Sequence, residues 1–119
     1  MIIGIGADLT EVEKVLKAGE KETFLRRIYT DSEREIFNKR KRSMAGNFAV
    51  KEAVVKMLGC GFRGINPSDI EVLRDDLGKP YVNLYNNALS KSEELGIKRI
   101  HVSITDTKEY AQAFVVGED

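Results

Sequence analysis

The sequence predicts an α+β fold, with helices packed on a small, largely antiparallel sheet. Three observations lead to this prediction. Helical patterns occupy the first half of the chain, two hairpin-like pairs of strand patterns occupy the second half, and no internal repeat or Pro/Gly-rich linker divides the 119 residues. A chain of this length builds one modest core, so residues 1–119 are expected to form a single domain.

The first elements are expected to be a short strand and a helix. The stretch 2–6, IIGIG, indicates a strand that its two glycines break. Thr10 and Glu13 have the spacing of a capping box. A helix is therefore predicted to begin near Glu11 and to end at Gly19, a residue type favoured after helices.

Two further helical patterns follow. Residues 22–28, ETFLRRI, predict a short helix that buries its apolar side chains. Thr30 and Glu33 repeat the capping-box spacing, which predicts a helix that carries a run of basic residues out to Arg42.

The segment FAVKEAVVKMLG predicts a helix from Phe48 to Leu58 that Gly59 closes. Almost every position is apolar, and the charged exceptions are Lys51, Glu52 and Lys56. A buried charge costs several kcal/mol unless a partner compensates it. This charged stripe is therefore expected to face either water or a ligand.

The second half of the chain alternates turn and strand signals. A loop is predicted at 60–69, two strands at 70–75 and 81–85 joined by the turn DLGKP, an amphipathic helix at 88–96, and the last strands at 99–105 and 111–116. In the strand 99–105, apolar residues alternate with His101, Ser103 and Thr105, which is typical of a strand with one buried face.

The composition counts against several classes of protein. The chain has 42% hydrophobic and 32% charged residues and a formal net charge of zero, so no overall charge favours nucleic acid or a membrane surface. Cys60 is the only cysteine, which excludes an internal disulfide and fits a reducing compartment. Without a basic amino-terminal region or an apolar run of about 20 residues, neither a signal peptide nor a membrane span is predicted. We expect a soluble protein of the cytoplasm.

Asp8 is the first candidate for a residue that faces a ligand. Leu9 occupies the place where a dinucleotide-binding G-x-G-x-x-G motif needs its third glycine, so that motif is absent. What remains is a strand that ends in a bend, with Asp8 just beyond it. Two interpretations stay open, because aspartate is common in turns: Asp8 shapes the turn, or it presents a carboxylate to a ligand.

Glu52 also has two interpretations. With Lys56 four residues on, it has the spacing of an exposed ion pair worth about 0.2–0.5 kcal/mol. Alternatively, Asp8 and Glu52 bind magnesium, which favours one or two carboxylates together with phosphate oxygens and water. Spacing alone does not decide between them.

Two other polar groups have ordinary explanations. His101, Ser103 and Thr105 fit the solvated face of an antiparallel sheet, and no oxyanion-hole motif supports a Ser–His pair for acyl transfer. Lys79 in the turn 78-GKP-80 could approach an anion, although a plain hairpin turn also accounts for it.

Three segments together resemble the signature blocks of a known family. The segments GIGADLTEV, AGNFAVKEAVVKMLGCG and HVSITDTKEYAQAFVV occur in this order. They are similar to the blocks G-I-G-x-D, F-A-x-K-E-A-x-x-K-A-x-G-T-G and V-S-x-S/T-H-T of the holo-[acyl-carrier-protein] synthases, the small bacterial 4′-phosphopantetheinyl transferases. The GKPYV turn also matches. The resemblance covers essentially the whole chain, and the F-A-x-K-E-A-x-x-K block is its most specific part.

The resemblance implies an activity and a site. Members of this family transfer 4′-phosphopantetheine from coenzyme A to a serine of apo acyl carrier protein and release 3′,5′-ADP, in fatty acid biosynthesis. By correspondence, Asp8 and Glu52 bind Mg²⁺, and Lys56 reaches the phosphates. The implied fold is the α+β phosphopantetheinyl transferase fold, assembled as a homotrimer with coenzyme A in clefts between subunits. The residues expected to line that cleft are Gly78, Lys79, Pro80, Ser103 and Thr105.

The resemblance also implies an acidic protein partner. Acyl carrier proteins are acidic around their modified serine, and the family docks them on its first two helical segments. The basic residues in that region are Lys14, Lys17, Lys21, Arg26 and Arg27. Such a patch speeds association and sets orientation, although the same residues also fit ordinary solvated helix faces.

Two residues depart from the family pattern. Asp106 stands where the third block has histidine, and Asn47 stands where many relatives have arginine. A carboxylate near phosphates is repulsive unless a metal or a base intervenes. Asp106 is therefore expected either to act catalytically beside Glu52 and Lys56, as a proton acceptor or a metal-facing group, or to point away and weaken coenzyme A binding. Asn47 is expected to remove one positive charge beside the phosphate site.

Other functions stay open on the residues alone. A magnesium-dependent nucleotide or phosphoester hydrolase would use the same Asp8 and Glu52. A non-catalytic module with a basic face between Arg26 and Arg42 would bind RNA with an affinity that falls steeply with salt. The zero net charge and the lack of aromatic stacking motifs count against that module. A purely structural oligomer would leave the charged stripe unexplained.

Overall fold

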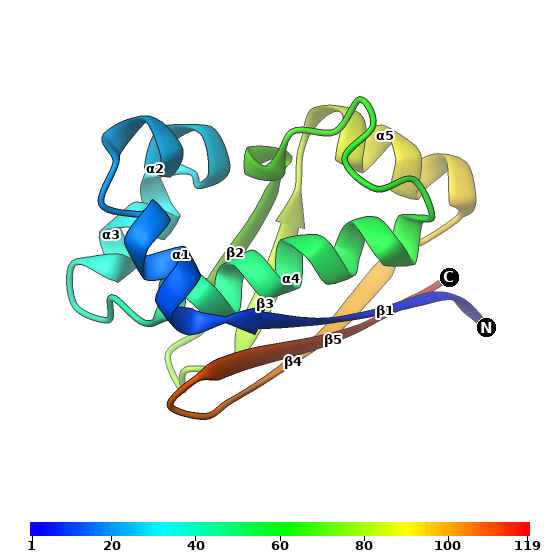
Figure 1. Ribbon diagram of the computed structural model, residues 1–119. Helices are drawn as coiled ribbons and strands as arrows, with labels where there is room; N and C mark the ends of the chain where they lie inside the picture. Colours follow the sequence, from blue (N-terminus) through cyan, green and yellow to red (C-terminus); the bar gives the residue numbers. More distant parts are fainter.

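Every strand pair in the computed structural model is antiparallel, which confirms the predicted α+β class (Figure 1). The structure describes residues 1–119. The strands are β1 (Ile2–Glu11), β2 (Ile70–Arg74), β3 (Pro80–Leu84), β4 (Arg99–Asp106) and β5 (Tyr110–Glu118). The helices are α1 (Val12–Ala18), α2 (Glu22–Ile28), α3 (Asp31–Phe37), α4 (Ser43–Leu58) and α5 (Asn86–Leu95), with a short 3-10 helix at Pro67–Asp69. One sheet has the order β1-β5-β4, and β2 and β3 form a separate hairpin.

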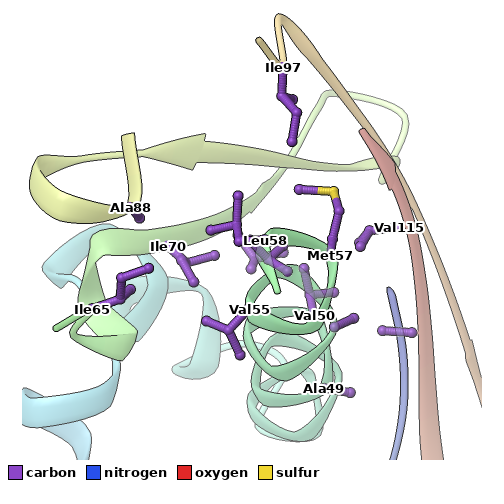
Figure 2. Close-up of a cluster of buried hydrophobic side chains, with 14 residues drawn as sticks. Ala49, Val50, Val55, Met57, Leu58, Ile65, Ile70, Ala88, Ile97 and Val115 are labelled. Carbon is purple, nitrogen blue, oxygen red and sulfur yellow. The ribbon is translucent and has the colours of Figure 1, made fainter. Parts of the chain in front are cut away.

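Helix α4 occupies the centre of the core. It lies between Ile70 of β2 and Val115 of β5, which are both fully buried (Figure 2). Helices α1, α2 and α3 gather around the start of α4, where Tyr29 and Phe37 build a second apolar cluster (Figure 1). Helix α5 lies near the other end of α4 (Figure 1). Because α4 is covered on several sides, its sequence is apolar nearly all round.

The glycines of the first strand do not break it, contrary to the sequence-based prediction. β1 is one strand from Ile2 to Glu11 and pairs with β5, with a shift of register between Ile2 and Gly4 and a regular register from Gly4 to Glu11. A Cβ atom added at Gly6 would lie 1.9 Å from the carbonyl oxygen of Ala53, and one at Gly4 would lie 2.7 Å from that of Met57. The two glycines therefore let β1 lie directly against α4. Asp8 consequently lies inside the strand and not in a bend beyond it.

The two predicted capping boxes have different outcomes. At α1 the prediction was wrong, because Thr10 Oγ1 donates a hydrogen bond to Asp8 Oδ2 at 2.7 Å and no side chain caps the helix. At α3 it is confirmed. There the Glu33 amide donates to Thr30 Oγ1 at 3.3 Å, and the Thr30 amide donates to Glu33 Oε1 at 3.1 Å.

The basic run between α3 and α4 is not helical, which corrects the predicted extension of α3 to Arg42. α3 ends at Phe37, and turns carry the chain to α4, which begins at Ser43, five residues before the predicted start at Phe48.

The end of α4 is as predicted, with Gly59 in the left-handed conformation at φ 79°. The hairpin, α5 and the last two strands also lie where the sequence predicted them, within a few residues. None of the helices is both long and apolar enough to cross a membrane.

Candidate active site

Asp8, Glu52 and Lys56 meet where β1 crosses the outer side of α4. Lys56 Nζ donates hydrogen bonds to the Ala7 carbonyl oxygen at 3.0 Å and to Asp8 Oδ1 at 3.3 Å. Thr10 Oγ1 holds the other oxygen, Asp8 Oδ2, at 2.7 Å. Asp8 and Glu52 line one cavity of about 510 Å³, whose apolar wall includes Phe24 and Phe48. The structure therefore brings together the three residues that the sequence placed at the metal and phosphate site.

The two carboxylates of this cavity influence each other. Burial raises the pKa of Glu52, the Asp8 carboxylate raises it further, and the Lys56 ammonium lowers it. No third acidic, histidine or cysteine side chain joins them in a metal-binding group. Two carboxylates with room for other oxygen ligands are the donor set that magnesium accepts when phosphates and water complete its coordination. The residues present therefore fit a magnesium ion.

Lys51 does not belong to this site, which corrects the expectation of a single charged stripe on α4. Its side chain is 1% exposed and its Nζ lies 2.7 Å from Oε1 of Glu33, which is fully buried. It also donates to the carbonyl oxygens of Pro67, at 3.0 Å, and Ile70. Burial raises the pKa of Glu33 and lowers that of Lys51, and their mutual attraction opposes both shifts. Lys51 is thus a core residue that ties α3 and the start of β2 to α4.

Asn47 belongs to the same buried network, so it does not remove a charge from the phosphate site as predicted. The residue is fully buried, and its Nδ2 donates to Glu33 Oε2 and to the Val72 carbonyl oxygen, both at 2.9 Å. Its Oδ1 has no hydrogen-bond partner. Sequence periodicity alone could not show this, because the burial of Asn47 depends on a glutamate from another helix.

A second cavity, of about 580 Å³, lies between the start of α4 and the β2–β3 turn. The residues that line it are Lys39, Arg40, Lys41, Arg42, Ser43, Gly46, Arg74, Gly78, Pro80, Ile104 and Asp106. It thus joins three predicted site residues, Gly78, Pro80 and Asp106. The carboxylate of Asp106 forms no hydrogen bond or ion pair, and the groups around it are mostly basic. We refer to this space as the basic cavity.

The other predicted cleft residues do not line the basic cavity within one chain. Ser103 and Thr105 alternate along β4 with Ile104 and Asp106, so they lie on the opposite face of the sheet. Lys79 lies in the adjoining turn but is not part of the cavity wall. Arg74 is a cavity residue that the sequence analysis missed. The sequence feature that could have indicated Arg74 is its position, as a basic residue four positions before Gly78 of the GKP turn.

A third surface lies beside the carboxylate cavity. Its groove, of about 580 Å³, is lined by Lys14, Lys17, Lys21 and Arg27 together with Ala18, Thr23 and Phe24. The groove shares Lys14, Ala18 and Phe24 with the cavity of Asp8 and Glu52. Arg26 lies outside it and pairs with Glu22 at 3.3 Å. Four of the five basic residues expected to dock an acidic partner thus line one groove that leads to the carboxylates.

Known proteins support the resemblance seen in the sequence. The family model of the 4′-phosphopantetheinyl transferase superfamily matches residues 4–115. The holo-[acyl-carrier-protein] synthase of Lachnoclostridium phytofermentans is 58% identical over 118 residues, covering 99% of this chain and 97% of that protein. The crystal structure of the holo-[acyl-carrier-protein] synthase of Neisseria meningitidis has a TM-score of 0.88 with 36% identity and covers 100% of both chains. That of Helicobacter pylori, in complex with coenzyme A, has a TM-score of 0.85 with 28% identity and covers 96% of this chain and 99% of that one. The chain therefore belongs to the holo-[acyl-carrier-protein] synthase family of the 4′-phosphopantetheinyl transferase superfamily.

Proposed function

We propose that this protein transfers the 4′-phosphopantetheine group of coenzyme A to a serine of apo acyl carrier protein in fatty acid biosynthesis and releases 3′,5′-ADP. The observation that carries the proposal is the meeting of Asp8, Glu52 and Lys56 where β1 crosses α4. The 58% identical relative is named for this activity, and a solved relative is described in complex with coenzyme A.

The chemistry asks the protein mainly for positioning and charge neutralisation. Asp8 and Glu52 would hold the magnesium ion, which when bound neutralises charge on the pyrophosphate. Lys56, now paired with Asp8, would turn its ammonium toward the phosphate oxygens. Thr10 keeps the Asp8 carboxylate in place from the other side.

The transfer exchanges one phosphorus–oxygen bond for another. The serine oxygen of the carrier protein bonds to the phosphorus next to pantetheine, and the bond from that phosphorus to the bridging oxygen breaks. The bridging oxygen leaves with 3′,5′-ADP, and the serine proton passes to a base. Glu52, which lines the carboxylate cavity beside Asp8, is one candidate to accept it. Asp106 is the other carboxylate near the proposed coenzyme A cleft.

A homotrimer with active sites between subunits would unite two half-sites that are separate in one chain. The carboxylate cavity and the basic cavity share no residue, although Thr10 and Asp106 both lie opposite Ala111 on the flanks of β5. The sheet face turned away from α4 exposes large apolar side chains, which favours burial against another chain. They include Ile5 (59%), Leu9 (63%) and Phe114 (42%). Ser103 and Thr105 lie on this same face, where a neighbouring subunit would complete the cleft.

The carrier protein would dock on the basic groove of Lys14, Lys17, Lys21 and Arg27. This groove leads directly to the carboxylate cavity, so an acidic helix bound there would bring its serine to the site. Charge complementarity of this kind raises association rates and sets orientation. A cytoplasmic location fits the single, unpaired Cys60.

The test of the proposal is transfer to purified apo acyl carrier protein, followed by intact-protein mass spectrometry. Sedimentation of the purified chain tests the trimer separately. Turnover of coenzyme A without any carrier protein would instead favour the hydrolase, which would use the same two carboxylates.

A further inference from the structure

Thr10 is the buried neighbour of Asp8 on the first strand. Residues two apart on a strand point to the same face, and the face of β1 that carries Gly6, Asp8 and Thr10 is turned toward α4. Thr10 is 8% exposed, and its Oγ1 donates a hydrogen bond to Asp8 Oδ2 at 2.7 Å. The Thr10 side chain forms no other hydrogen bond, since it does not cap α1. Its hydroxyl therefore serves the carboxylate alone.

The two oxygens of Asp8 are held in different ways. Oδ1 accepts a hydrogen bond at 3.3 Å from Lys56, whose long side chain is 54% exposed. Oδ2 accepts its hydrogen bond from Thr10, whose β-branched side chain has few rotamers and is buried. A cation that approaches Asp8 can therefore replace the Lys56 ammonium at Oδ1, whereas the Thr10 hydroxyl stays at Oδ2.

This difference affects how many oxygens a metal ion can take from Asp8. Magnesium demands a nearly ideal octahedron and keeps several waters, so a single oxygen of a carboxylate suits it. Calcium takes about 6–8 oxygen ligands and accepts both oxygens of one carboxylate. An ion that binds Oδ1 alone leaves the hydrogen bond from Thr10 intact, whereas an ion that binds both oxygens competes with the Thr10 hydroxyl for Oδ2.

We propose that Thr10 is a positioning residue that makes Asp8 a ligand through Oδ1 alone and so makes the site prefer magnesium to calcium. The proposal rests on the proposed function for the divalent-metal site at Asp8 and Glu52. It adds to that site a residue that acts through the orientation of Asp8 and not through contact with the metal. Hydrogen-bonding partners of metal ligands typically change metal affinity by about 10- to 100-fold.

The test uses Thr10→Val, which removes the hydroxyl and keeps the β-branched shape. The probe is Mn²⁺, which carboxylate sites for magnesium also accept and whose free-ion EPR signal disappears on binding. Mg²⁺ and Ca²⁺ are then added separately to displace it, with and without coenzyme A. Thr10→Val should weaken Mg²⁺ binding by about 10- to 100-fold and Ca²⁺ binding by less than about threefold. Equal losses for both ions, no loss for Mg²⁺, or wild-type protein that binds no Mn²⁺ in either condition overturns the proposal.

Two further variants separate the hydroxyl from the packing of residue 10. Thr10→Ser keeps the hydroxyl and should restore Mg²⁺ affinity to within about threefold of wild type. Ser90→Ala removes an exposed hydroxyl from α5 and should change neither affinity. If Thr10→Ser binds Mg²⁺ as weakly as Thr10→Val does, the shape of the side chain and not its hydroxyl sets the affinity, and the proposal is wrong.

Transfer kinetics give a second readout. Thr10→Val should raise the magnesium concentration that gives half-maximal transfer and change kcat at saturating magnesium little. A lower kcat with that concentration unchanged would show a structural defect only and would contradict the proposal. The predicted metal preferences together with no transfer to any carrier protein would refute the proposed function and leave the role of Thr10. Transfer by the wild type, with the same metal preference in Thr10→Val, would keep the proposed function and refute the role of Thr10.

Discussion

Nζ of Lys51 on α4 lies 2.7 Å from Oε1 of Glu33 on α3, and neither side chain is more than 1% exposed. The next residue along the helix, Glu52, lines the cavity that also holds Asp8. Two adjacent charges of one helix therefore have separate tasks. Lys51 holds the core together, and Glu52 lines the cavity that is proposed to serve phosphate chemistry.

Replacing Lys51 should destabilise the protein strongly. Lys51→Ala leaves the Glu33 carboxylate buried without its cation, although the Thr30 amide and the Asn47 side chain still donate hydrogen bonds to it. Breaking a buried ion pair in this way costs about 3–5 kcal/mol. Urea unfolding at fixed protein concentration measures the loss, and exposed Lys98→Ala is the control. The double variant Lys51→Ala/Glu33→Ala should lose less than the sum of the two single variants. A loss below about 1 kcal/mol for Lys51→Ala contradicts this role of the pair.

Glu71 should make the stability depend on acid pH. Burial alone would raise its pKa, but hydrogen bonds from Thr30, Asn83 and Tyr85 outweigh burial and hold the pKa below the ordinary value of 4.5. A carboxyl group with a lowered pKa stabilises the folded state above its unfolded pKa, and this contribution disappears as the pH falls through the folded value. Wild-type protein should therefore lose stability below pH 4.5.

The variant Glu71→Gln isolates this effect. It should be less stable than wild type by about 1–2 kcal/mol at pH 7, and the difference should shrink on the acid side of the ordinary glutamate pKa. Glu93→Gln removes an exposed carboxylate from α5 as a control. Thermal unfolding at a series of pH values gives the comparison. A difference between Glu71→Gln and wild type that is independent of pH would show that the lost hydrogen bonds, and not the charge, account for the change.

Asp106→His should be tolerated or beneficial for transfer. Asp106 lines the basic cavity without a hydrogen bond or ion pair, so its replacement breaks no contact in the chain. Histidine would also remove a negative charge from a space that is expected to bind phosphate. Steady-state kinetics with coenzyme A measure the effect. A severe loss of kcat would mean that the Asp106 carboxylate has a catalytic role of its own.

Asp8→Ala and Glu52→Ala should each abolish most of the transfer while the fold persists. Both carboxylates belong to the proposed magnesium site, and neither is part of the apolar core. Glu13→Ala, which removes an exposed carboxylate from α1, should keep its activity. Circular dichroism checks the fold of each variant. Retained activity in both site variants would refute their assignment as metal ligands.

Local patterns predicted much of the fold because they act over short distances. The Thr30–Glu33 capping box, the left-handed Gly59 and the alternation along β4 each depend on residues close in sequence, and each is present as predicted. The glycines of β1 misled the prediction, since their role depends on Ala53 and Met57, far along the chain. Turn propensity predicted a break in the strand at these glycines. The structure instead requires glycine there because β1 packs closely against α4.

The site was predictable only as far as the family resemblance reached. Asp8, Glu52 and Lys56 meet as the resemblance implied, although spacing alone left Glu52 undecided. The burial of Lys51 and Asn47 could not be read from α4, because their partner Glu33 lies on another helix. Such contacts depend on tertiary packing, which periodicity does not encode.

The most direct test of the central claim is intact-protein mass spectrometry of apo acyl carrier protein after incubation with this protein, coenzyme A and magnesium, beside an identical sample with EDTA. The account predicts that the carrier gains the mass of one phosphopantetheine group with magnesium and none with EDTA. Unmodified carrier together with consumption of coenzyme A would contradict it and favour a hydrolase. An equal gain with and without EDTA would keep the transferase but contradict a metal site at Asp8 and Glu52.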